Sequence, residues 1–395
     1  MKLYLQFGFN MRPTTMELLQ NGCGAGVVLS PRDQNDKQLI KTAAEINDFG
    51  ADLLFDPQCF AHDSDHTKLT AHGYFSEFKS TTTSNIISGA GAAKILKKLF
   101  ALNVALETKR IILPGTLADP VSDPWFAFQE KIVQEALKIF TGYELFATVA
   151  LSNTVMLDEA QIEAVVERAA KWQVNGFYVV VQSTSYLSES PVWLANLLIL
   201  TSGLKLLRKE IIVGYCSHQM LSLACANVDA IASGTWLNVR AFDPAKFYIP
   251  PENDDKRRAT WYYCPQALSE FKLPFLDLAR TMGKLNAMVP QPDSNFANAL
   301  FAGPAPTTIA WKERNAFLHY LSCLDKQAKA TIQTTFDSAV AAHQAALDQA
   351  EKVLDGLHKI GVTGQVRDFE PIFAVNRGAL IAFSNARATQ LRHNW

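Results

Sequence analysis

The feature that most constrains this chain is a repeated alternation of short apolar runs with helical sequence over roughly its first 240 residues. Eight apolar runs occur, and each is followed by residues with helical spacing. Strands and helices that alternate in this way are typical of a parallel α/β sheet. The runs expected to form strands are 2–9, 27–29, 52–55, 110–113, 145–151, 176–181, 211–215 and a run that begins at residue 228.

Eight such units predict a closed (β/α)8 barrel of the TIM type over residues 1–245, because the eight runs span the usual length of that fold. An open, doubly wound sheet is the alternative. No GxGxxG follows the first apolar run, which argues against a Rossmann-type start.

After residue 245 the pattern changes. Residues 246–308 are expected to form an irregular and helical segment that wraps the barrel mouth, and residues 309–395 a mostly helical C-terminal extension. Apolar residues at steps of three and four between Phe336 and Leu357 predict a narrow seam, which requires a partner helix from this chain or from a second subunit. Residues 61–84 show no clear period and are expected to form a long loop with a functional or lid role.

Composition narrows the class of protein. The formal net charge of −1 argues against binding nucleic acid through overall charge, although a local basic patch is allowed. Six cysteines without a CxxC pair indicate neither a zinc ribbon nor a disulfide framework. The absence of a signal-peptide pattern and of a membrane-length apolar run leads us to expect a cytoplasmic protein with reduced thiols.

Ligand-facing residues of such a barrel follow the carboxyl ends of the strands. Amides and aromatic residues outnumber carboxylates there. Amides can read the donor and acceptor edges of a planar heterocycle, while an aromatic ring stacks on its face. The candidate substrate-binding residues are Asn10, Arg32, Gln58, Asn153, Gln182, His218, Ser233, Trp236, Asn238 and Arg240.

Acidic residues at these ends are few, which restricts the chemistry. A glycosidase needs two facing carboxylates, and only Asp56 is securely placed. A metallohydrolase needs several histidines beside carboxylates, whereas His218 stands alone, so neither a metal nor a cofactor is expected. Asp56 is the candidate general base or nucleophile. Ser233 and Gly234 are a candidate phosphate-binding turn.

Three segments resemble the tRNA-guanine transglycosylases and their DNA-modifying 7-deazaguanine relatives. The residues around strands seven and eight are similar to the family's VG…L…A…GVD…PTRNAR pattern. Residues 54–60 are similar to its strand-end DSGGFQ motif. Residues 313–317 are similar to a helix that follows the family's zinc subdomain. The matching positions of the first segment are Val213, Gly214, Leu221, Ala224, Val228, Asp229, Thr235, Asn238 and Arg240. The resemblance implies a TIM-type barrel that acts on a guanine-like base in nucleic acid.

The chain also departs from that family. Ala232 occupies the position of the family's nucleophilic aspartate, and Cys264 stands without the other zinc-ligating cysteines. Asp229, which matches the aspartate of GVD, joins Asp56 as a candidate catalytic residue. Either the chemistry uses a different nucleophile, or the chain is a non-catalytic paralogue or partner subunit that keeps a base pocket.

The leading prediction is therefore a transglycosylase-like protein of nucleic-acid base modification, which recognises a deazaguanine-type base or a nucleotide at the barrel mouth. The alternatives are a non-catalytic nucleic-acid-binding or partner subunit of a modification or defence complex, and a phosphate-binding barrel lyase or hydrolase. DNA or tRNA is the expected macromolecular partner, and the C-terminal helices are the expected oligomer contact. The candidate nucleic-acid-binding residues are Arg257, Arg258, Arg377, Arg387 and Arg392.

Overall fold

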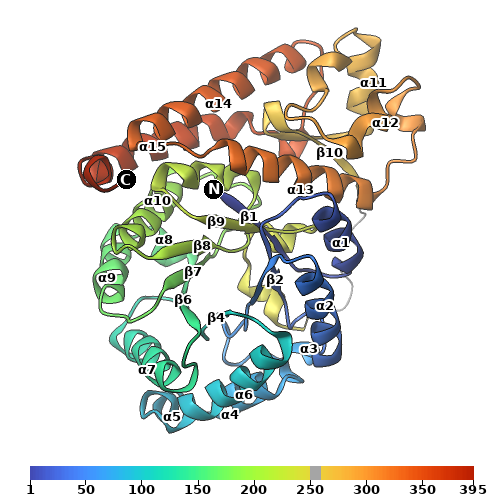
Figure 1. Ribbon diagram of the computed structural model, residues 1–395. Coiled ribbons are helices and arrows are strands. Elements are labelled where there is room, and N and C mark those ends of the chain that lie inside the picture. The colour runs from blue at the N-terminus through green and yellow to red at the C-terminus, as the bar shows by residue number, and fades with distance from the viewer. Residues whose placement is uncertain (250–258) are drawn as a thin grey trace.

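The computed structural model describes residues 1–249 and 259–395. Its main sheet is a parallel, nearly closed barrel with strand order β3-β2-β1-β9-β8-β7-β6-β4 (Figure 1). The strands are β1 (Lys2–Gln6), β2 (Gly26–Leu29), β3 (Asp52–Phe55), β4 (Arg110–Ile112), β6 (Glu144–Leu151), β7 (Gly176–Val181), β8 (Glu210–Val213) and β9 (Ala230–Ser233). The two-residue strand β5 (Leu117–Ala118) pairs with β6.

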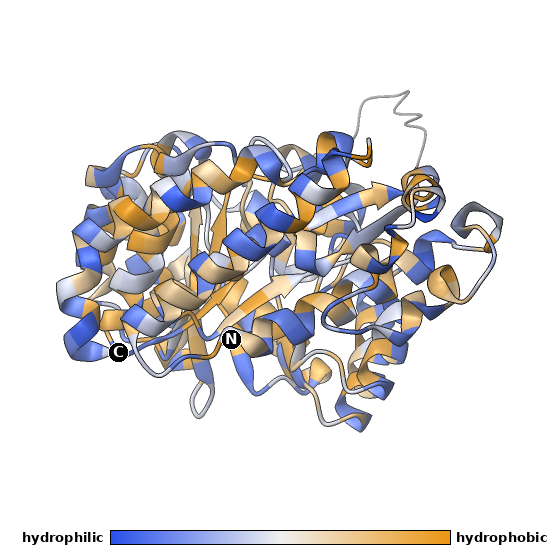
Figure 2. Cartoon of the chain, turned by 90° about the horizontal axis from the view of Figure 1, so that it is seen from above, coloured by the Kyte–Doolittle hydropathy of each residue, from blue (hydrophilic) through white to orange (hydrophobic). Residues whose placement is uncertain are grey.

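The predicted TIM-type barrel is confirmed, because β1 pairs with β2 on one side and with β9 on the other. The two outermost strands, β3 and β4, are neighbours, and beyond them the amide of Leu117 donates to the carbonyl oxygen of Phe60 at 3.0 Å. Nearly every strand residue is buried, since the inner face packs in the barrel and the outer face lies under helices. Figure 2 shows the same arrangement, with apolar strands inside and hydrophilic residues on the outer helices.

Helices and one 3-10 segment connect successive strands around the barrel. Several begin at side-chain caps, such as Ser122 and Ser190, whose hydroxyls accept from amides three residues later. The connections include α1 (Arg12–Gln20), α2 (Asp36–Asp48), α6 (Ala90–Leu106), α7 (Asp123–Ile139), α8 (Asn153–Met156), α9 (Glu159–Ala169), α10 (Pro191–Leu206) and the 3-10 helix η1 (His218–Ala226).

The expectation of an irregular loop over residues 61–84 was wrong. The region holds α3 (Thr67–Thr70), α4 (Gly73–Ser80) and the start of α5 (Thr83–Ile87). Tyr74, Phe75 and Phe78 are buried, and the ring centroids of Phe75 and Phe78 lie 5.6 Å apart. These aromatic residues, which are spaced for a helix, form a small core that fixes the segment.

Within the segment expected to be irregular and helical, residues 259–308 hold short helices and turns and also an unexpected β-hairpin. Its antiparallel strands are β10 (Trp261–Cys264) and β11 (Ser269–Lys272). Leu268 adopts a left-handed φ of 50°, which ends the 3-10 turn η4 (Pro265–Ala267) and allows the chain to reverse. The elements that follow are α11 (Leu273–Thr281), α12 (Asn298–Phe301) and the 3-10 turns η5 (Leu285–Met288), η6 (Asn295–Ala297) and η7 (Pro306–Thr308).

The C-terminal extension consists of α13 (Glu313–Ala330), α14 (Phe336–His358), η8 (Gln365–Arg367) and α15 (Glu370–Asn394). The seam of α14 finds its partner within this chain, since α14 packs on α15 and the rings of Phe336 and Phe383 lie 5.9 Å apart. In turn α15 packs on α10, whose residues 193–204 are all buried. Figure 1 shows α13, α14 and α15 on one side of the barrel.

Within the described residues, the helices are too short or too polar to cross a membrane.

Arg110 closes the amino end of the barrel. It is the first residue of β4, and its guanidinium pairs with Asp52 at 2.6 Å, Glu144 at 3.3 Å and Glu210, the first residues of β3, β6 and β8. The guanidinium also lies 4.4 Å from the centroid of Phe146. One cation therefore holds three carboxylates that would otherwise repel each other.

We predict that Arg110→Met lowers the free energy of unfolding by about 3 kcal/mol, because it leaves these carboxylates together without a counter-charge. Urea denaturation at neutral pH measures the change. Arg314→Met, which breaks the more exposed pair with Glu17, is the control and should cost about 0.5 kcal/mol. Equal losses in the two variants would contradict the role of Arg110.

Candidate functional site

Asp56 follows β3 at the carboxyl end of the barrel and has no exposed surface. Its carboxylate accepts hydrogen bonds from the amide of Gln58 at 3.0 Å and from the hydroxyls of Tyr215 and Tyr178 at 3.0 and 3.3 Å. Tyr178 belongs to β7, and Tyr215 follows β8. Three strands thus bring donors to one carboxyl group.

Gln58 links this carboxyl group to β2. Its side-chain nitrogen donates to the hydroxyls of Ser30 and Tyr215 at 2.9 and 3.0 Å, and its side-chain oxygen accepts from the amide of Arg32 at 3.1 Å. The structure therefore brings the predicted residues Asp56, Gln58 and Arg32 together. We call Asp56, Gln58, Tyr178 and Tyr215 the Asp56 cluster.

Two members of the Asp56 cluster have a strained backbone. Gln58 and Tyr215 have φ angles of 53° and 57°, in the left-handed region that bulky residues rarely adopt. Each such residue costs about 1–3 kcal/mol and persists only where its surroundings hold it, often at functional sites. The neighbouring Gly214 is required, because a Cβ there would lie 2.4 Å from the Tyr178 hydroxyl.

Burial raises the pKa of Asp56 to about 7, although its hydrogen bonds and the nearby Arg32 act in the opposite direction. The group consequently exchanges a proton near neutral pH, as a general acid or base must. Gln6 adds a further polar group, since its side-chain oxygen accepts from Tyr178 at 3.1 Å and its buried nitrogen has no partner among the described residues.

Residues 242–249, which we call the strap, cover the mouth of the barrel. The ring centroids of Phe242 and Phe247 lie 4.9 and 5.2 Å from that of Phe60, and Phe242 lies 5.4 Å from Tyr215. The amide of Ser183 donates to the carbonyl oxygen of Phe242 at 3.1 Å. Residues 246–249, the described start of the segment expected to wrap the mouth, belong to this strap.

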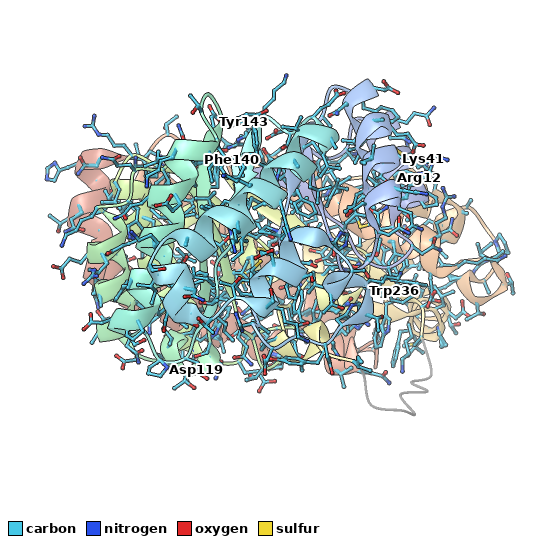
Figure 3. The ribbon with its side chains drawn as sticks, turned by 90° about the horizontal axis from the view of Figure 1, so that it is seen from below. Arg12, Lys41, Asp119, Phe140, Tyr143 and Trp236 are labelled. Carbon is cyan, nitrogen blue, oxygen red and sulfur yellow. The ribbon has the colours of Figure 1, made fainter. Side chains whose placement is uncertain are left out.

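A pocket of about 430 Å³ lies beside the strap-covered mouth, where β1 and β2 end. We call it the β1–β2 pocket. The cations Arg12, Lys41 and Lys68 line it together with Asn10, whose φ is 53°. Figure 3 shows Arg12 and Lys41 on the neighbouring helices α1 and α2. The other lining residues are Phe7, Gly8, Phe9, Met11, Pro13, Asp33, Gln34, Gln38 and Thr42.

His218 and Arg240 belong to a second buried group, centred on Glu270 of β11. The Glu270 carboxylate accepts from the Tyr186 hydroxyl at 2.7 Å and pairs with Arg240 at 3.5 Å and with Arg367. Nδ1 of His218 lies 3.4 Å from the same Tyr186 hydroxyl. Burial lowers the pKa of His218 to about 4, so the ring is neutral at neutral pH.

Asn153 and Gln182 form a third group, in which the Asn153 amide donates to the Gln182 side-chain oxygen at 3.1 Å. We expected one ligand-sized cavity to be lined by Asp56, Asn153, Gln182, His218 and Arg240, but the structure does not bring these residues together. They divide into three hydrogen-bonded groups, and the space lined by both Tyr215 and Arg240 measures about 20 Å³. That volume holds about one water molecule.

Ser233 is the last residue of β9, and Trp236 and Asn238 follow it in the turn that packs against β1. The Trp236 indole donates to the Phe9 carbonyl oxygen at 3.1 Å, and Asn238 is half-buried in the 3-10 turn η2 (Leu237–Val239). At Gly234 a Cβ would lie 2.3 Å from the Gln6 carbonyl oxygen, so this glycine permits close packing on β1.

Asp229 does not join the Asp56 cluster. It precedes β9 and therefore lies at the amino end of the barrel, away from the mouth. Its carboxylate binds the Lys205 ammonium at 2.6 and 2.7 Å and accepts from the Ile211 amide at 2.8 Å. This position corrects the prediction that Asp229 is catalytic.

The predicted nucleic-acid-binding arginines of the C-terminal region are engaged in ion pairs. Arg377 pairs with Asp348 and Glu351, Arg387 with Glu163, and Arg392 with Asp337. A phosphate would have to compete with these carboxylates. Arg257 and Arg258 lie outside the described residues.

No group of three or more histidine, cysteine or acidic side chains suited to hold a metal ion occurs in the described part of the chain. The six cysteines are free and buried.

Sequence reasoning missed Gln6, Tyr178 and Glu270. Gln6 and Tyr178 lie within strands that were read as apolar runs, and Glu270 lies in the unexpected hairpin. In a barrel every second strand residue points inward, so the polar residues Gln6 and Tyr178 inside buried strands were the available signal.

No protein-family model and no curated protein matches this chain. Among solved structures, thiamine phosphate pyrophosphorylase from Pyrococcus furiosus matches with a TM-score of 0.32 and 10% identity over 59% of this chain and 85% of that one. The carboxyl transferase domain of Rhizobium etli pyruvate carboxylase, with 3-hydroxypyruvate, matches with a TM-score of 0.35 and 12% identity over 97% and 77% of the two chains.

The pH dependence of stability tests the buried state of Asp56. Its pKa is 3.8 in the reference state and about 7 when folded, so stability falls as pH rises from about 4 to 7 and then levels off. Relative to Asp56→Asn, we expect the wild type to lose about 2–3 kcal/mol of unfolding free energy between pH 5 and pH 8 in urea denaturation.

The exposed Glu167 of α9 supplies the control, and Glu167→Gln should follow the wild-type curve. A wild-type curve parallel to that of Asp56→Asn would show that Asp56 is ionised in the folded protein at pH 5.

Proposed function

We propose that this protein recognises a nucleotide, or a nucleobase attached to a phosphate, at the carboxyl end of the barrel, and that it acts in transglycosylase-like modification of nucleic-acid bases. The β1–β2 pocket is the observation that carries this proposal. It combines an aromatic ring, amides and cations in about 430 Å³, a volume suited to a small ligand.

The aromatic and amide groups suit a base. The Phe9 side chain is 60% exposed beside the pocket, which leaves its ring available for stacking. The side chain of Gln34 donates to the Thr42 hydroxyl at 2.9 Å, while its buried oxygen has no partner among the described residues. That oxygen is an acceptor for a base N–H group.

The cations suit a phosphate. Lys41 forms no ion pair within residues 1–249 and 259–395, and the Lys68 ammonium is bound only by the Asp33 carbonyl oxygen at 3.2 Å. Arg12 pairs with Glu45, at 2.8 Å between Nε and Oε2. Asp33 is the one acidic residue in the pocket lining against three cations, so the lining favours an anion.

A chain of hydrogen bonds joins this pocket to Asp56. Ser30 donates to Asp33 at 2.9 Å, Gln58 donates to Ser30, and Gln58 and Asp56 share the Tyr215 hydroxyl. In the proposed reaction the ionised Asp56 attacks the anomeric carbon, the C–N bond to the resident base breaks, and that base leaves with the bonding electrons and takes up a proton. The incoming base then loses its N–H proton and displaces the Asp56 carboxylate from the same carbon. Alternatively, Asp56 removes the N–H proton of the incoming base, whose nitrogen displaces the resident base directly. Asp56 is covered here, so the reaction requires Phe242 and Phe247 of the strap to move aside.

A second candidate function is nucleotide binding without chemistry, as in a partner subunit. The complete burial of Asp56 favours it, as does the engagement of Arg240 with Glu270.

Calorimetric titration with GMP and with guanosine tests the binding site. GMP should bind more tightly than guanosine, and Lys41→Ala should weaken GMP binding about tenfold, which corresponds to roughly 1.4 kcal/mol, with little effect on guanosine. Lys37→Ala, an exposed lysine of α2 outside the pocket, is the control. If Lys41→Ala and Lys37→Ala bind GMP equally well, the phosphate is not held in this pocket.

Exchange of labelled guanine into tRNA or DNA tests the reaction. We expect Asp56→Asn to reduce exchange by at least a hundredfold while GMP affinity stays within about twofold, since Asp56 does not line the pocket. Unchanged exchange in Asp56→Asn would remove this residue from the mechanism. Wild-type protein that binds GMP without exchanging guanine would favour the non-catalytic candidate.

A further inference from the structure

A second large pocket, of about 360 Å³, lies between the C-terminal extension and the barrel. We call it the α14 pocket. Its walls come from η1 of the barrel, from the turn of the hairpin, from α13 and from α14. Figure 1 shows α13, α14 and the hairpin strand β10 on one side of the barrel. The described lining residues are His218, Gln219, Leu221, Ala224, Pro265, Gln266, Leu268, Gln291, Pro292, Gln327, Ala330, Thr331, Ala339, Ala342, His343, Ala346, Gln349 and Phe369.

Among the described lining residues there is no lysine, arginine, aspartate or glutamate. Its polar groups are amides, one hydroxyl and two imidazoles, and the remainder is apolar. An ion placed here would lose its hydration without gaining a counter-charge, which is strongly unfavourable. The pocket therefore selects against charged ligands, in contrast to the cationic β1–β2 pocket.

Both imidazoles are neutral at neutral pH. Burial lowers the pKa of His218 and of His343 to about 4. A neutral imidazole carries one N–H donor and one acceptor nitrogen. The Asn376 side chain lies against the His343 ring, and Nε2 of that ring is buried. Donors and acceptors in the lining thus come from neutral imidazole and amide groups.

Small residues of α14 create the space. Ala339, Ala342 and Ala346 line the pocket. Leu347 and Leu354 of the same helix are buried, and α14 packs on α15. The helix is thus held by α15 while its alanines leave room toward the barrel.

We propose that the α14 pocket binds an uncharged, planar heterocyclic molecule that has both a hydrogen-bond donor and an acceptor. The volume, the apolar walls with a few polar groups, and the position between two parts of the fold are those of small-molecule sites. The proposal is independent of the proposed function, because the two pockets share no lining residue.

Ligand-observed NMR with indazole tests the site, since indazole is an uncharged bicycle with one donor and one acceptor nitrogen. The charged counterpart is indazole-3-carboxylate. Indazole should bind the full-length wild type, and the carboxylate should bind at least tenfold more weakly. Ala342→Phe, which fills the pocket, should weaken indazole binding at least tenfold. Ala345→Phe, at an exposed position of α14 outside the pocket, should leave it within twofold.

Ala346→Phe is a second filling variant at a more exposed position of α14, in case Ala342→Phe does not fold. GMP binding should be unchanged in all three variants. The proposal is overturned if indazole fails to bind the wild type, if the carboxylate binds equally well, or if both filling variants bind indazole like the wild type. A dimer in light scattering that Ala342→Phe dissociates would assign the pocket to a second copy of the chain and would also overturn it.

Discussion

The pairing of β1 with β9 is the constraint on which the rest of the structure depends. Because the first and last strands of the barrel share a ladder, all eight strands point the same way around one axis and their carboxyl ends form a single rim. Asp56 follows β3 and Tyr215 follows β8, so these two residues are far apart in the chain and meet across the closed barrel. Arg110 secures the opposite end, where it gathers the acidic residues that begin three strands.

Much of this arrangement could be predicted from the sequence, for a physical reason. Strands buried on both faces are continuous apolar runs, so the eight strands were recognisable, and the residues that follow them were assigned to the rim. The proximity of Asp56, Gln58 and Arg32 follows from that assignment. The division of the rim into three groups does not follow from that assignment. It depends on Glu270, which comes from the unexpected hairpin. Asp229 became a candidate because it matches the aspartate of the GVD pattern, whereas its position just before β9 places it at the amino end of the barrel.

Glu270 and Asp56 show how the surroundings of a buried carboxyl group determine whether it is ionised. Both are almost fully buried, and burial alone would raise the pKa of each. Glu270 has Arg367 and Arg240 beside it, and the net effect is a lowered pKa. Asp56 is bound chiefly by hydroxyl and amide groups, and its pKa is raised to about 7. Glu270 is thus a fixed anion that joins the hairpin to the barrel, whereas Asp56 keeps a proton that it can exchange.

The strap links the protonation state of Asp56 to the exposure of its carboxyl group to solvent. Desolvation is the largest influence on the pKa of Asp56, and Phe60, Phe242 and Phe247 form the apolar cover above its cluster. Displacement of that cover would admit water and lower the pKa toward the ordinary value of 3.8, which would release the proton. At neutral pH a large fraction of the carboxyl groups is therefore protonated when the mouth is closed, and opening of the strap would shift the group toward its ionised form.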